Sequence, residues 1–342
     1  AENLEQKAEG DIGRVLNGQA SGVQINATNG VSGSATNIVI RGYTSISQGN
    51  QPLFIVDGVP FSSDTNAQGN FVNGNNGSSR FIDLDPNNIE SINVLKGLAA
   101  ANLYGTAGRN GVILITTKNG ATGNVNKKLE ISVNQSVFFT EIASLPDYQD
   151  KYGGGFDQAF GWFFSNWGPS FRDSGPEDFG SAFRGVANDG TILISHPTQN
   201  NAAVAAAFPE FADTPYPYRP YDNVKDFFRT GSAVNTSINA QGRSEDGKIS
   251  YAANFGHLED KGFTPGNKLR RNTFGFGGKA ELSNSFSING TLGYTRTDFF
   301  SPPVAASTGN GAFGSGSSVF GHVFFTPRSI DLMGLPYQNP ID

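Results

Sequence analysis

The sequence has 342 residues, 44 glycines, no cysteine and a formal net charge of -6, with a pI near 5.2. The lack of cysteine excludes disulfides, thiolate metal sites and cysteine nucleophiles, and the acidic balance argues against nucleic acid as a partner, because duplex binding needs a basic face. No run of about 18 apolar residues occurs in the chain, which excludes a transmembrane helix.

Four short apolar runs in the first third of the chain predict strands. Residues 38–40, 53–56, 92–95 and 112–117 are rich in Ile, Val, Leu and Phe and are bounded by Gly, Asn, Asp or Pro, so we expect them in one small buried sheet. Asp57-Gly58 tolerates positive φ and predicts a tight turn. Asp85-Pro86 predicts the start of a short helical turn, and a small-residue helix is expected from residue 98 until Gly105. The result is a compact α/β module.

The motifs in this module carry a family resemblance. IRGYTS, PLFIVDGVP, IESINVLKG and ANLYGTAGRNGVILITTK, preceded by GRVLNGQASGVQI, resemble the plug domain of the SusC/RagA family, the TonB-dependent outer-membrane transporters of Bacteroidetes. One position departs from the family pattern, because Gly97 follows Lys96 where an acidic residue is usual. The resemblance implies a plug domain over residues 1–122 and the N-terminal part of a transmembrane β-barrel over residues 123–342.

After residue 120 the hydrophobic pattern changes to alternation with a period of two. Five segments place apolar residues at every second position and polar residues between them, which predicts five antiparallel strands with one apolar and one polar face. The runs have about 7 to 11 residues, and a strand of about 9 to 11 residues crosses hydrocarbon at a tilt. The segments are 129–139, 234–241, 249–255, 274–282 and 286–294. A half-buried strand of a soluble sandwich is the alternative for any one of them alone.

The connections between these strands alternate between short and long. Short turns are expected at 243–247 and 283–285, and long connections at 141–231, at 257–270 and after Thr297. Brief periplasmic turns and extended extracellular loops are typical of outer-membrane barrels, so the first strand is expected to run outward from the periplasm. Plugged transporters have about 22 strands, so five cannot close the barrel and we expect the chain to be incomplete. The polar first residues likewise suggest a longer parent that has lost its leader.

Candidate cargo-binding residues lie in the long connection and in the plug. The segment DYQDKYGGGFDQAFGWFFSNWGPSF holds both tryptophans of the chain, and aromatic faces there could stack on sugars or hold apolar side chains of peptides. They could instead pack this loop into a folded lobe. An Asn-rich plug loop at 64–80 offers amide donors and acceptors, although any solvated loop is rich in amides. The candidates are Trp162, Trp167, Tyr152, Phe163, Asn73, Asn75 and Asn76.

Three basic residues of the plug motifs are candidates for contacts between plug and barrel. The resemblance implies charged groups at that boundary, and Arg41, Lys96 and Arg109 lie in the matching motifs. The alternative is that each is an ordinary salt-bridged or solvated charge.

Catalysis is not expected. His196, His257 and His322 are far apart in the sequence and lack the spacing of a local metal motif. No G-x-x-x-x-G-K-[ST] motif occurs, and Asp85, which pairs with Asp83 in the sequence, already has a predicted capping role. We therefore expect no catalytic residues, no cofactor and no metal site.

The resemblance implies a transporter subunit that imports oligosaccharides or peptides across the outer membrane of a Gram-negative, Bacteroidetes-like cell. It also implies a SusD-like surface lipoprotein as a partner, and it allows a dimer of such pairs. TonB would act through a segment that lies outside this chain. One alternative is a non-transporting barrel that serves as scaffold or adhesin, and another is a soluble β-rich binding protein. The residues do not distinguish a glycan cargo from a peptide cargo.

Overall fold

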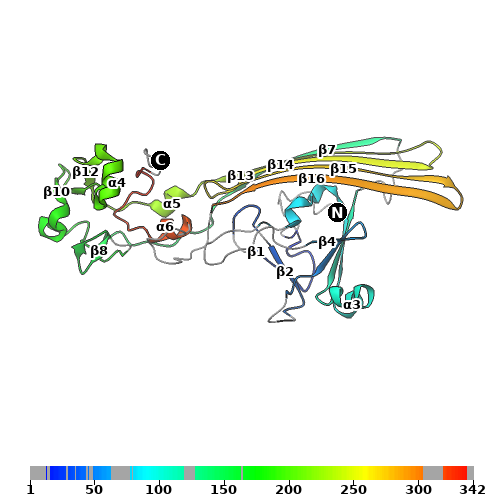
Figure 1. Ribbon diagram of the computed structural model, residues 1–342, viewed down its shortest axis with the longest axis horizontal. Coiled ribbons are helices and arrows are strands. Elements are labelled where there is room, and N and C mark those ends of the chain that lie inside the picture. Colours follow the sequence, from blue (N-terminus) through cyan, green and yellow to red (C-terminus); the bar gives the residue numbers. More distant parts are fainter. Residues whose placement is uncertain are drawn as a thin grey trace. The chain divides into compact units, whose positions relative to one another are not determined.

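The computed structural model describes residues 13, 16–27, 30–34, 36–43, 45, 49–62, 78, 80–118, 128–162, 165–302 and 319–336. The chain divides into two compact units, whose elements are labelled in Figure 1. The first comprises residues 1–70, 75–141 and 230–302, and the second comprises residues 71–74, 142–229 and 303–342. The first unit therefore holds the N-terminal module and all five predicted long strands, and the second holds most of the long connection.

The N-terminal module, which we call the plug, is built on a four-stranded sheet in the order β4-β3-β6-β5. Strands β3 and β6 are parallel, and the other two pairs are antiparallel. A parallel pair needs a crossover connection, which here carries β5 and the short helices. The elements are β3 (Leu53–Val56), β4 (Val59–Phe61), η1 (Arg80–Asp83), η2 (Pro86–Asn88), β5 (Ile89–Leu95), α3 (Leu98–Tyr104), η3 (Gly105–Gly108) and β6 (Val112–Thr117). All four predicted strands and the predicted helix form, and three of the strands lie in this sheet.

The turn and the cap predicted from the sequence both form. Asp57 and Gly58 have φ values of 48° and 84°, the positive pair that a tight hairpin requires. The Asp57 carboxylate also accepts hydrogen bonds from the backbone N–H and hydroxyl of Thr117, at 2.8 and 2.6 Å. Asp85 caps η2, because its Oδ1 accepts the backbone N–H of Asn87 at 3.1 Å. Asp57 thus stabilises the turn between β3 and β4, and Asp85 stabilises the start of η2.

The prediction of a single plug sheet is wrong in one respect. The run at 38–40 belongs to β2 (Thr36–Ile40), which pairs with β1 (Val23–Ala27) in a separate two-stranded antiparallel sheet. β1 was not predicted, because its five residues are too few for their alternation to give a clear strand signal. Apolar composition predicted correctly that β2 is buried, but it carries no information about which strand pairs with it.

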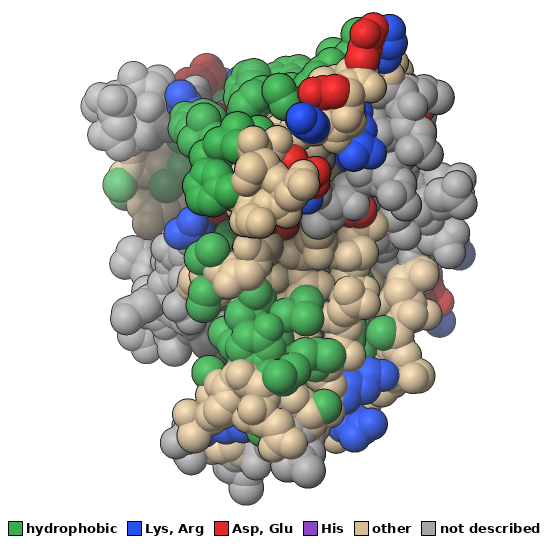
Figure 2. Space-filling view, turned by 90° about the vertical axis from the view of Figure 1, so that its right-hand side faces the viewer, with side chains coloured by type: hydrophobic (Ala, Val, Ile, Leu, Met, Phe, Trp, Pro, Cys, Tyr) green, Lys and Arg blue, Asp and Glu red, His purple; other side chains and the backbone are tan. Residues whose placement is uncertain are grey.

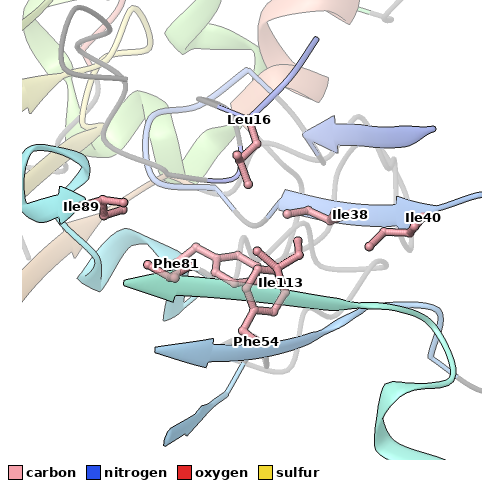
Figure 3. Packing of buried hydrophobic residues seen from close by; sticks show 8 residues of the cluster. Leu16, Ile38, Ile40, Phe54, Phe81, Ile89 and Ile113 are labelled. Atoms are coloured by element: carbon pink, nitrogen blue, oxygen red, sulfur yellow. The ribbon is translucent and has the colours of Figure 1, made fainter. Parts of the chain in front are cut away.

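The plug core lies between these two sheets and the 3-10 turns. Ile38, Phe54, Phe81 and Ile113 are all at most 1% exposed, and the rings of Phe54 and Phe81 are 4.3 Å apart at their centroids. Figure 3 shows these side chains converging from β2, β3, η1 and β6. Burying side chains of this size stabilises a fold by about 1.5–3 kcal/mol each. The core is thus assembled from segments that are distant in the sequence.

The five predicted long strands form one antiparallel sheet, which we call the wall, in the order β16-β15-β14-β13-β7. Each consecutive pair is joined in continuous register, with one irregularity between β15 and β16. The strands are β7 (Glu130–Thr140), β13 (Gly231–Arg243), β14 (Ile249–Lys261), β15 (Lys268–Ser283) and β16 (Phe286–Phe300). This confirms the five alternating segments as neighbouring strands of one sheet.

The wall strands are longer than their apolar runs. They have 11 to 16 residues, and the connection predicted at 257–270 shrinks to residues 262–267. The reason is that strand pairing is made by the backbone, so the ladder continues through polar residues where the apolar alternation has stopped. The alternation therefore marks the extent of the apolar band, not the ends of the strands.

The two faces of the wall differ in side-chain type and in exposure. On one face, polar and small side chains such as Asn235, Ser237 and Ala252 are buried. On the other face the apolar side chains are open, and Figure 2 shows hydrophobic side chains gathered on the surface beside charged ones. An apolar face of this kind contacts hydrocarbon in membrane barrels. Members that are 51 to 73% exposed are Leu129, Ile131, Val133, Val137, Phe139, Ile249, Phe274, Phe276, Leu282, Phe286, Ile288, Leu292 and Tyr294.

The second unit, which we call the lobe, is a folded body made of short elements. Its three-stranded sheet has the order β10-β11-β12, and β8 and β9 form a separate small hairpin. The elements are β8 (Gly155–Phe156), β9 (Ala159–Phe160), η4 (Pro176–Ala182), β10 (Phe183–Val186), β11 (Ile192–Ser195), η5 (Pro197–Asn200), α4 (Ala202–Ala207), η6 (Pro209–Phe211), β12 (Pro215–Pro217), α5 (Asn223–Phe227) and α6 (Val319–Phe325). In the part of the chain that is described, no helix has both the length and the apolarity to cross a membrane.

An aromatic core holds the lobe together. Phe179, Ile194, Tyr216 and Tyr218 are buried, and the ring of Tyr218 meets that of Phe179 edge-on at 4.8 Å. The Tyr218 hydroxyl donates to the carbonyl of Pro169 at 2.8 Å, so the buried phenol is satisfied. Burial raises the pKa of the Tyr216 and Tyr218 hydroxyls above the ordinary range of tyrosine. The segment predicted as a loop is therefore a packed structure.

Candidate functional site

The principal candidate site is the contact between the plug and the wall, which is centred on Arg271 of β15. Its side chain is fully buried, and the residue is only 1% exposed. Its Nη1 donates to the carbonyl oxygens of Ile82 and Leu84, both at 2.9 Å, and its Nη2 lies 3.3 Å from Oδ1 of Asp85. A guanidinium from the wall thus binds two backbone carbonyls and one carboxylate of the plug.

Local structure presents these acceptors to the wall. The turns η1 and η2 expose the Ile82 and Leu84 carbonyls, and capping of η2 fixes the Asp85 side chain. The neighbouring strand leaves room for that carboxylate, because a Cβ built at Gly256 would lie 2.0 Å from Asp85 Oδ2. Only glycine fits there without movement of Asp85.

Further contacts surround the Arg271 site. The hydroxyl of Thr297 in β16 donates to Oδ1 of Asp83 at 2.8 Å. An apolar cluster lies beside these polar groups and joins Ile82 of the plug to Leu258 and Leu269 of the wall. A cavity of about 170 Å³ adjoins the contact and is lined in part by Asp57, Asp83 and Asp85 of the plug and Asn254 and Thr291 of the wall.

A second polar contact joins Ser32 of the plug to the connection between β14 and β15. The side chain of Asn267 accepts the backbone N–H of Ser32 at 3.0 Å and donates to the Ser32 carbonyl at 3.1 Å. The Ser32 hydroxyl donates to Oδ1 of Asp260 at 3.0 Å.

The basic residues predicted for the plug–barrel boundary occupy other surroundings. Lys96 donates from Nζ to the Ser21 carbonyl within the plug. Arg41 has a φ of 59°, and a Cβ at Gly97 would lie 3.3 Å from its Nη1, which explains why glycine suits that position. Arg109 is exposed at the end of η3. Their plug–barrel role stays a prediction, and the wall contact that the structure describes is made by Arg271, which sequence reasoning missed.

The predicted cargo residues fall into three groups. Trp162 is half-buried and packs edge-on against Phe160 at 4.9 Å. Tyr152 and Trp167 are exposed by 41% and 74%, respectively. Phe163 lies outside the described residues, and so do the three plug asparagines, Asn73, Asn75 and Asn76. The lobe thus presents Tyr152 and Trp167 to solvent while it packs Trp162.

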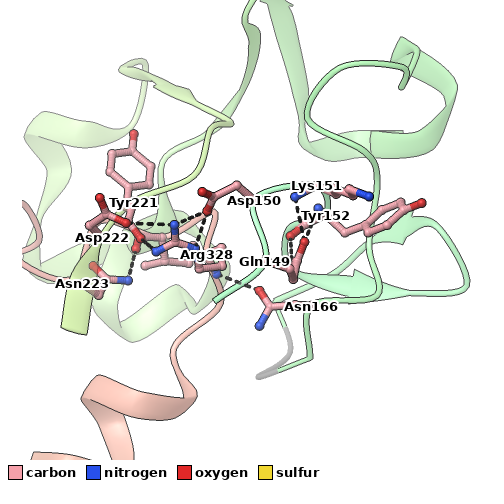
Figure 4. Close-up of polar contacts among 10 residues, drawn as sticks. Gln149, Asp150, Lys151, Tyr152, Asn166, Tyr221, Asp222, Asn223 and Arg328 are labelled. Atoms are coloured by element: carbon pink, nitrogen blue, oxygen red, sulfur yellow. Dashed lines mark hydrogen bonds and ion pairs between the residues drawn. The ribbon is translucent and has the colours of Figure 1, made fainter. Parts of the chain in front are cut away.

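The lobe also contains an arginine centre that the sequence did not indicate. The Arg328 guanidinium binds the carboxylates of Asp150 and Asp222 and the Tyr221 carbonyl. Its backbone N–H donates to Oδ1 of Asn166 at 2.8 Å, as Figure 4 shows. Three segments of the lobe, around residues 150, 166 and 221–222, therefore meet at this one residue. Within the described ranges, no group of three His, Cys, Asp or Glu side chains could hold a metal ion.

Comparison with known proteins agrees with this architecture. The family described as TonB-dependent Receptor Plug Domain matches residues 1–112. The chain is 33% identical over 147 residues to TonB-dependent receptor P26 of Formosa agariphila, covering 43% of this chain and 13% of that protein. It is 30% identical over 171 residues to TonB-dependent receptor SusC of Bacteroides thetaiotaomicron, covering 49% of this chain and 15% of that protein. The chain is thus similar to the SusC/RagA family of TonB-dependent receptors, and its first 112 residues match their plug domain.

Solved structures show the same fold. The RagAB peptide importer in its open-open state matches with a TM-score of 0.66 at 20% identity, covering 99% of this chain and 34% of that one. Its closed-closed state gives a TM-score of 0.64 and covers 96% of this chain and 32% of that one. The fold is thus an α/β plug followed by the first strands of an antiparallel transmembrane β-barrel. The chain spans only 13 to 15% of the length of these two curated relatives.

Proposed function

We propose that the protein imports oligosaccharides or peptides across the outer membrane in a TonB-dependent manner. The observation that carries this proposal is the Arg271 contact, in which the wall holds the plug through one ion pair and two hydrogen bonds to backbone carbonyls. A plug held in this way is stable at rest, but a pull concentrated on one turn could release it. Similarity to the TonB-dependent receptor SusC supports the dependence on TonB, and similarity to the RagAB peptide importer supports import and a peptide cargo.

In this proposal the plug extends over residues 1–122 and the barrel part over residues 123–342. TonB pulls on a segment of the protein that connects to the plug, the bilayer covers the apolar face of the wall, and a SusD-like lipoprotein closes the extracellular side. Cargo binding shifts the populations of plug states, and the pull supplies the work of opening. A dimer of transporter–lipoprotein pairs is compatible with this arrangement.

The proposed cargo surface is the exposed aromatic part of the lobe, formed by Tyr152, Trp167 and the 51% exposed Phe156. Gln149 holds the backbone of Tyr152, because its Oε1 accepts the Tyr152 N–H at 2.8 Å and its Nε2 donates to the Tyr152 carbonyl at 2.7 Å. The Trp167 carbonyl accepts the N–H of Gln158 at 2.9 Å. Fixed backbones with exposed rings suit stacking on sugars or contact with apolar peptide side chains.

Uptake by cells tests this function. Cells that carry the whole protein should accumulate a labelled oligosaccharide or peptide mixture, and they should lose this ability when the gene is deleted or when TonB is inactivated. Trp167→Ala should weaken cargo binding by about two- to tenfold, the effect of losing one aromatic contact. Val186→Ala, another exposed apolar position in the lobe, is the matched control and should bind cargo normally. Normal uptake in the deletion strain would favour the scaffold or adhesin role.

A further inference from the structure

A group of charged side chains lies on the lipid-side face of the wall, at the loop-side end of its apolar band. Side chains alternate along a strand, so every second residue from Phe274 and Phe276 towards the start of β15 shares their face, which places Arg270 and Lys268 there. The same alternation places Glu259 and Lys261 of β14, and Arg296 and Asp298 of β16, on this face. We call this group the rim cluster, and it consists of Glu259, Lys261, Lys268, Arg270, Arg296 and Asp298.

The rim cluster carries more positive charge than its own carboxylates neutralise. Oε1 of Glu259 is shared by three cations: Nζ of Lys268 at 3.3 Å, Nη2 of Arg270 at 3.5 Å and Nζ of Lys261 at 3.9 Å. Arg296 pairs separately with Asp298 at 3.4 Å. Three cations gathered around one carboxylate repel one another, so an additional anion would be bound favourably. All four basic side chains are 36 to 67% exposed and accessible to such an anion.

The register of the strands gives the depth of the rim cluster. On β14, β15 and β16, Phe255, Phe274 and Tyr294 form the last apolar row before the cluster, and Glu259, Arg270 and Asp298 form a row four residues further on. Apolar rings flank the cluster itself, since Lys268 pairs with Phe300 and Ser232 pairs with both Lys261 and Phe139. Four residues span about 13 Å along a strand, or about 9 Å along the membrane normal at a tilt near 45°. Headgroup regions occupy about 5–8 Å on each side of the hydrocarbon core. Because apolar rings still flank them, the basic side chains lie at the loop-side edge of the apolar band, where hydrocarbon gives way to headgroups.

We propose that the rim cluster binds the phosphate of an anionic lipid headgroup in the leaflet on the loop side of the membrane. This inference rests on the part of the proposed function that places the wall in a membrane. Arginine and lysine are the usual ligands of phosphate, and Arg270 and Arg296 offer planar forks for it. The occupant is a lipid because the cluster continues directly from the apolar band, so one molecule can place its acyl chains on the band and its phosphate on the cations.

Lipid retention by the whole protein tests this assignment. The purified protein is exchanged into nanodiscs of phosphatidylcholine that contain a minor fraction of phosphatidylglycerol, and the lipids that remain bound are counted by native mass spectrometry. The wild type should retain phosphatidylglycerol in clear excess over its bulk fraction. The double variant Lys268→Gln/Arg270→Gln should lower this excess about tenfold, since each basic residue contributes several-fold to anionic lipid binding.

Two further variants separate charge from folding. Glu259→Gln removes the shared carboxylate and should increase phosphatidylglycerol retention, whereas a purely structural role of the cluster would lower it. Lys279→Gln lies on the same strand but at the opposite end and on the opposite face, and it should retain lipid as the wild type does. If the double variant fails to fold, the response of Glu259→Gln alone decides.

Inorganic phosphate distinguishes a lipid site from a site for free anions. Addition of millimolar phosphate to the nanodiscs should leave the phosphatidylglycerol excess nearly unchanged, because the acyl chains contribute to binding. Complete displacement by phosphate, or equal retention of both lipids by the wild type, would overturn the proposal. Selective retention by a protein that imports nothing would overturn the transport function and leave the lipid site standing.

Discussion

The plug core and the outer face of the wall use the same residue types in opposite surroundings. Ile38, Phe54 and Ile113 are at most 1% exposed within the plug. On the wall, Ile288, Phe276 and their neighbours are more than half exposed. Leaving an apolar side chain of this size in water forfeits about 1.5–3 kcal/mol. The comparison shows that the plug folds by excluding water from its own interior, while the wall depends on a solvent of hydrocarbon.

Arg271 joins these two regions, and its replacement should have the largest effect. Arg271→Met leaves Asp85 and the Ile82 and Leu84 carbonyls without their guanidinium, and breaking a buried ion pair costs about 3–5 kcal/mol. We expect much faster hydrogen exchange of the amides at residues 82–88 in the whole protein.

Arg270→Met is the matched control, because the adjacent side chain lies on the opposite face and its ion pair is exposed. It should change exchange in the plug by less than about 1 kcal/mol. Equal effects of the two substitutions would show that Arg271 does not hold the plug.

One pair of side-chain truncations compares packing in the plug core with packing on the outer face of the wall. Phe54→Ala opens a cavity in a closed interior and should destabilise the plug by about 3–5 kcal/mol. Phe276→Ala removes the same ring from the outer face, where lipid chains fill the space, and should cost less than half as much. Thermal denaturation of the whole protein in detergent, followed by protease digestion of the plug, measures both effects. A larger loss in Phe276→Ala would mean that the wall face packs against protein.

An arginine introduced on either face of β16 tests the difference between the lipid-side face and the inward face of the wall. Ile288→Arg places a cation on the lipid-side face and should cost about 2–4 kcal/mol if the residue lies near the middle of the membrane. Asn289→Arg alters the next residue, which faces the barrel interior, and should cost far less. The fraction of whole protein that migrates as folded barrel on an unheated gel reports this difference. Similar folded fractions for the two variants would contradict a lipid-facing band.

The smallest expected effect concerns pH and is confined to the lobe. Burial lowers the pKa of His196, whose ring stacks on Phe211 at 4.2 Å. The folded lobe therefore binds protons less readily than the unfolded chain, so stability is retained above the unfolded pKa of about 6.5 and falls as the pH drops below it. The lobe should lose thermal stability between pH 7 and pH 5, and His196→Phe should remove that dependence. An unchanged slope in this variant would assign the pH effect to other groups.

Local sequence patterns predicted part of this structure, and they predicted more of the wall than of the plug. Apolar runs bounded by turn residues placed β3, β5 and β6, and alternation placed all five wall strands, because both signals lie within one segment. The pairing of β1 with β2 and the individual strands of the lobe were not predicted, because these short strands find partners only in the tertiary structure. Packing of the lobe itself was one of the two alternatives that the aromatic residues left open.

The candidate site shows the same limit. Arg271 lies in a polar stretch where the apolar alternation has stopped, so no motif marks it. Phe274 and Phe276 face outward, so strand alternation places Arg271, at an odd position, on the inward face. A charged residue on that face needs a partner. The identity of that partner, a turn nearly two hundred residues earlier, depends on how plug and wall meet. The same applies to Arg328, whose carboxylate partners lie 178 and 106 residues away.

The central claim is that the wall turns alternate side chains towards lipid, and single cysteines along β16 test it most directly. The chain has no cysteine, so once any cysteines in the rest of the whole protein are replaced, each position from 286 to 297 can carry one spin label in bilayers. The account predicts a period of two, with even positions from 286 to 294 accessible to lipid-soluble oxygen and odd positions accessible to a water-soluble relaxation agent or shielded by the plug. Accessibility without alternation, or even positions that are shielded from oxygen, would contradict it.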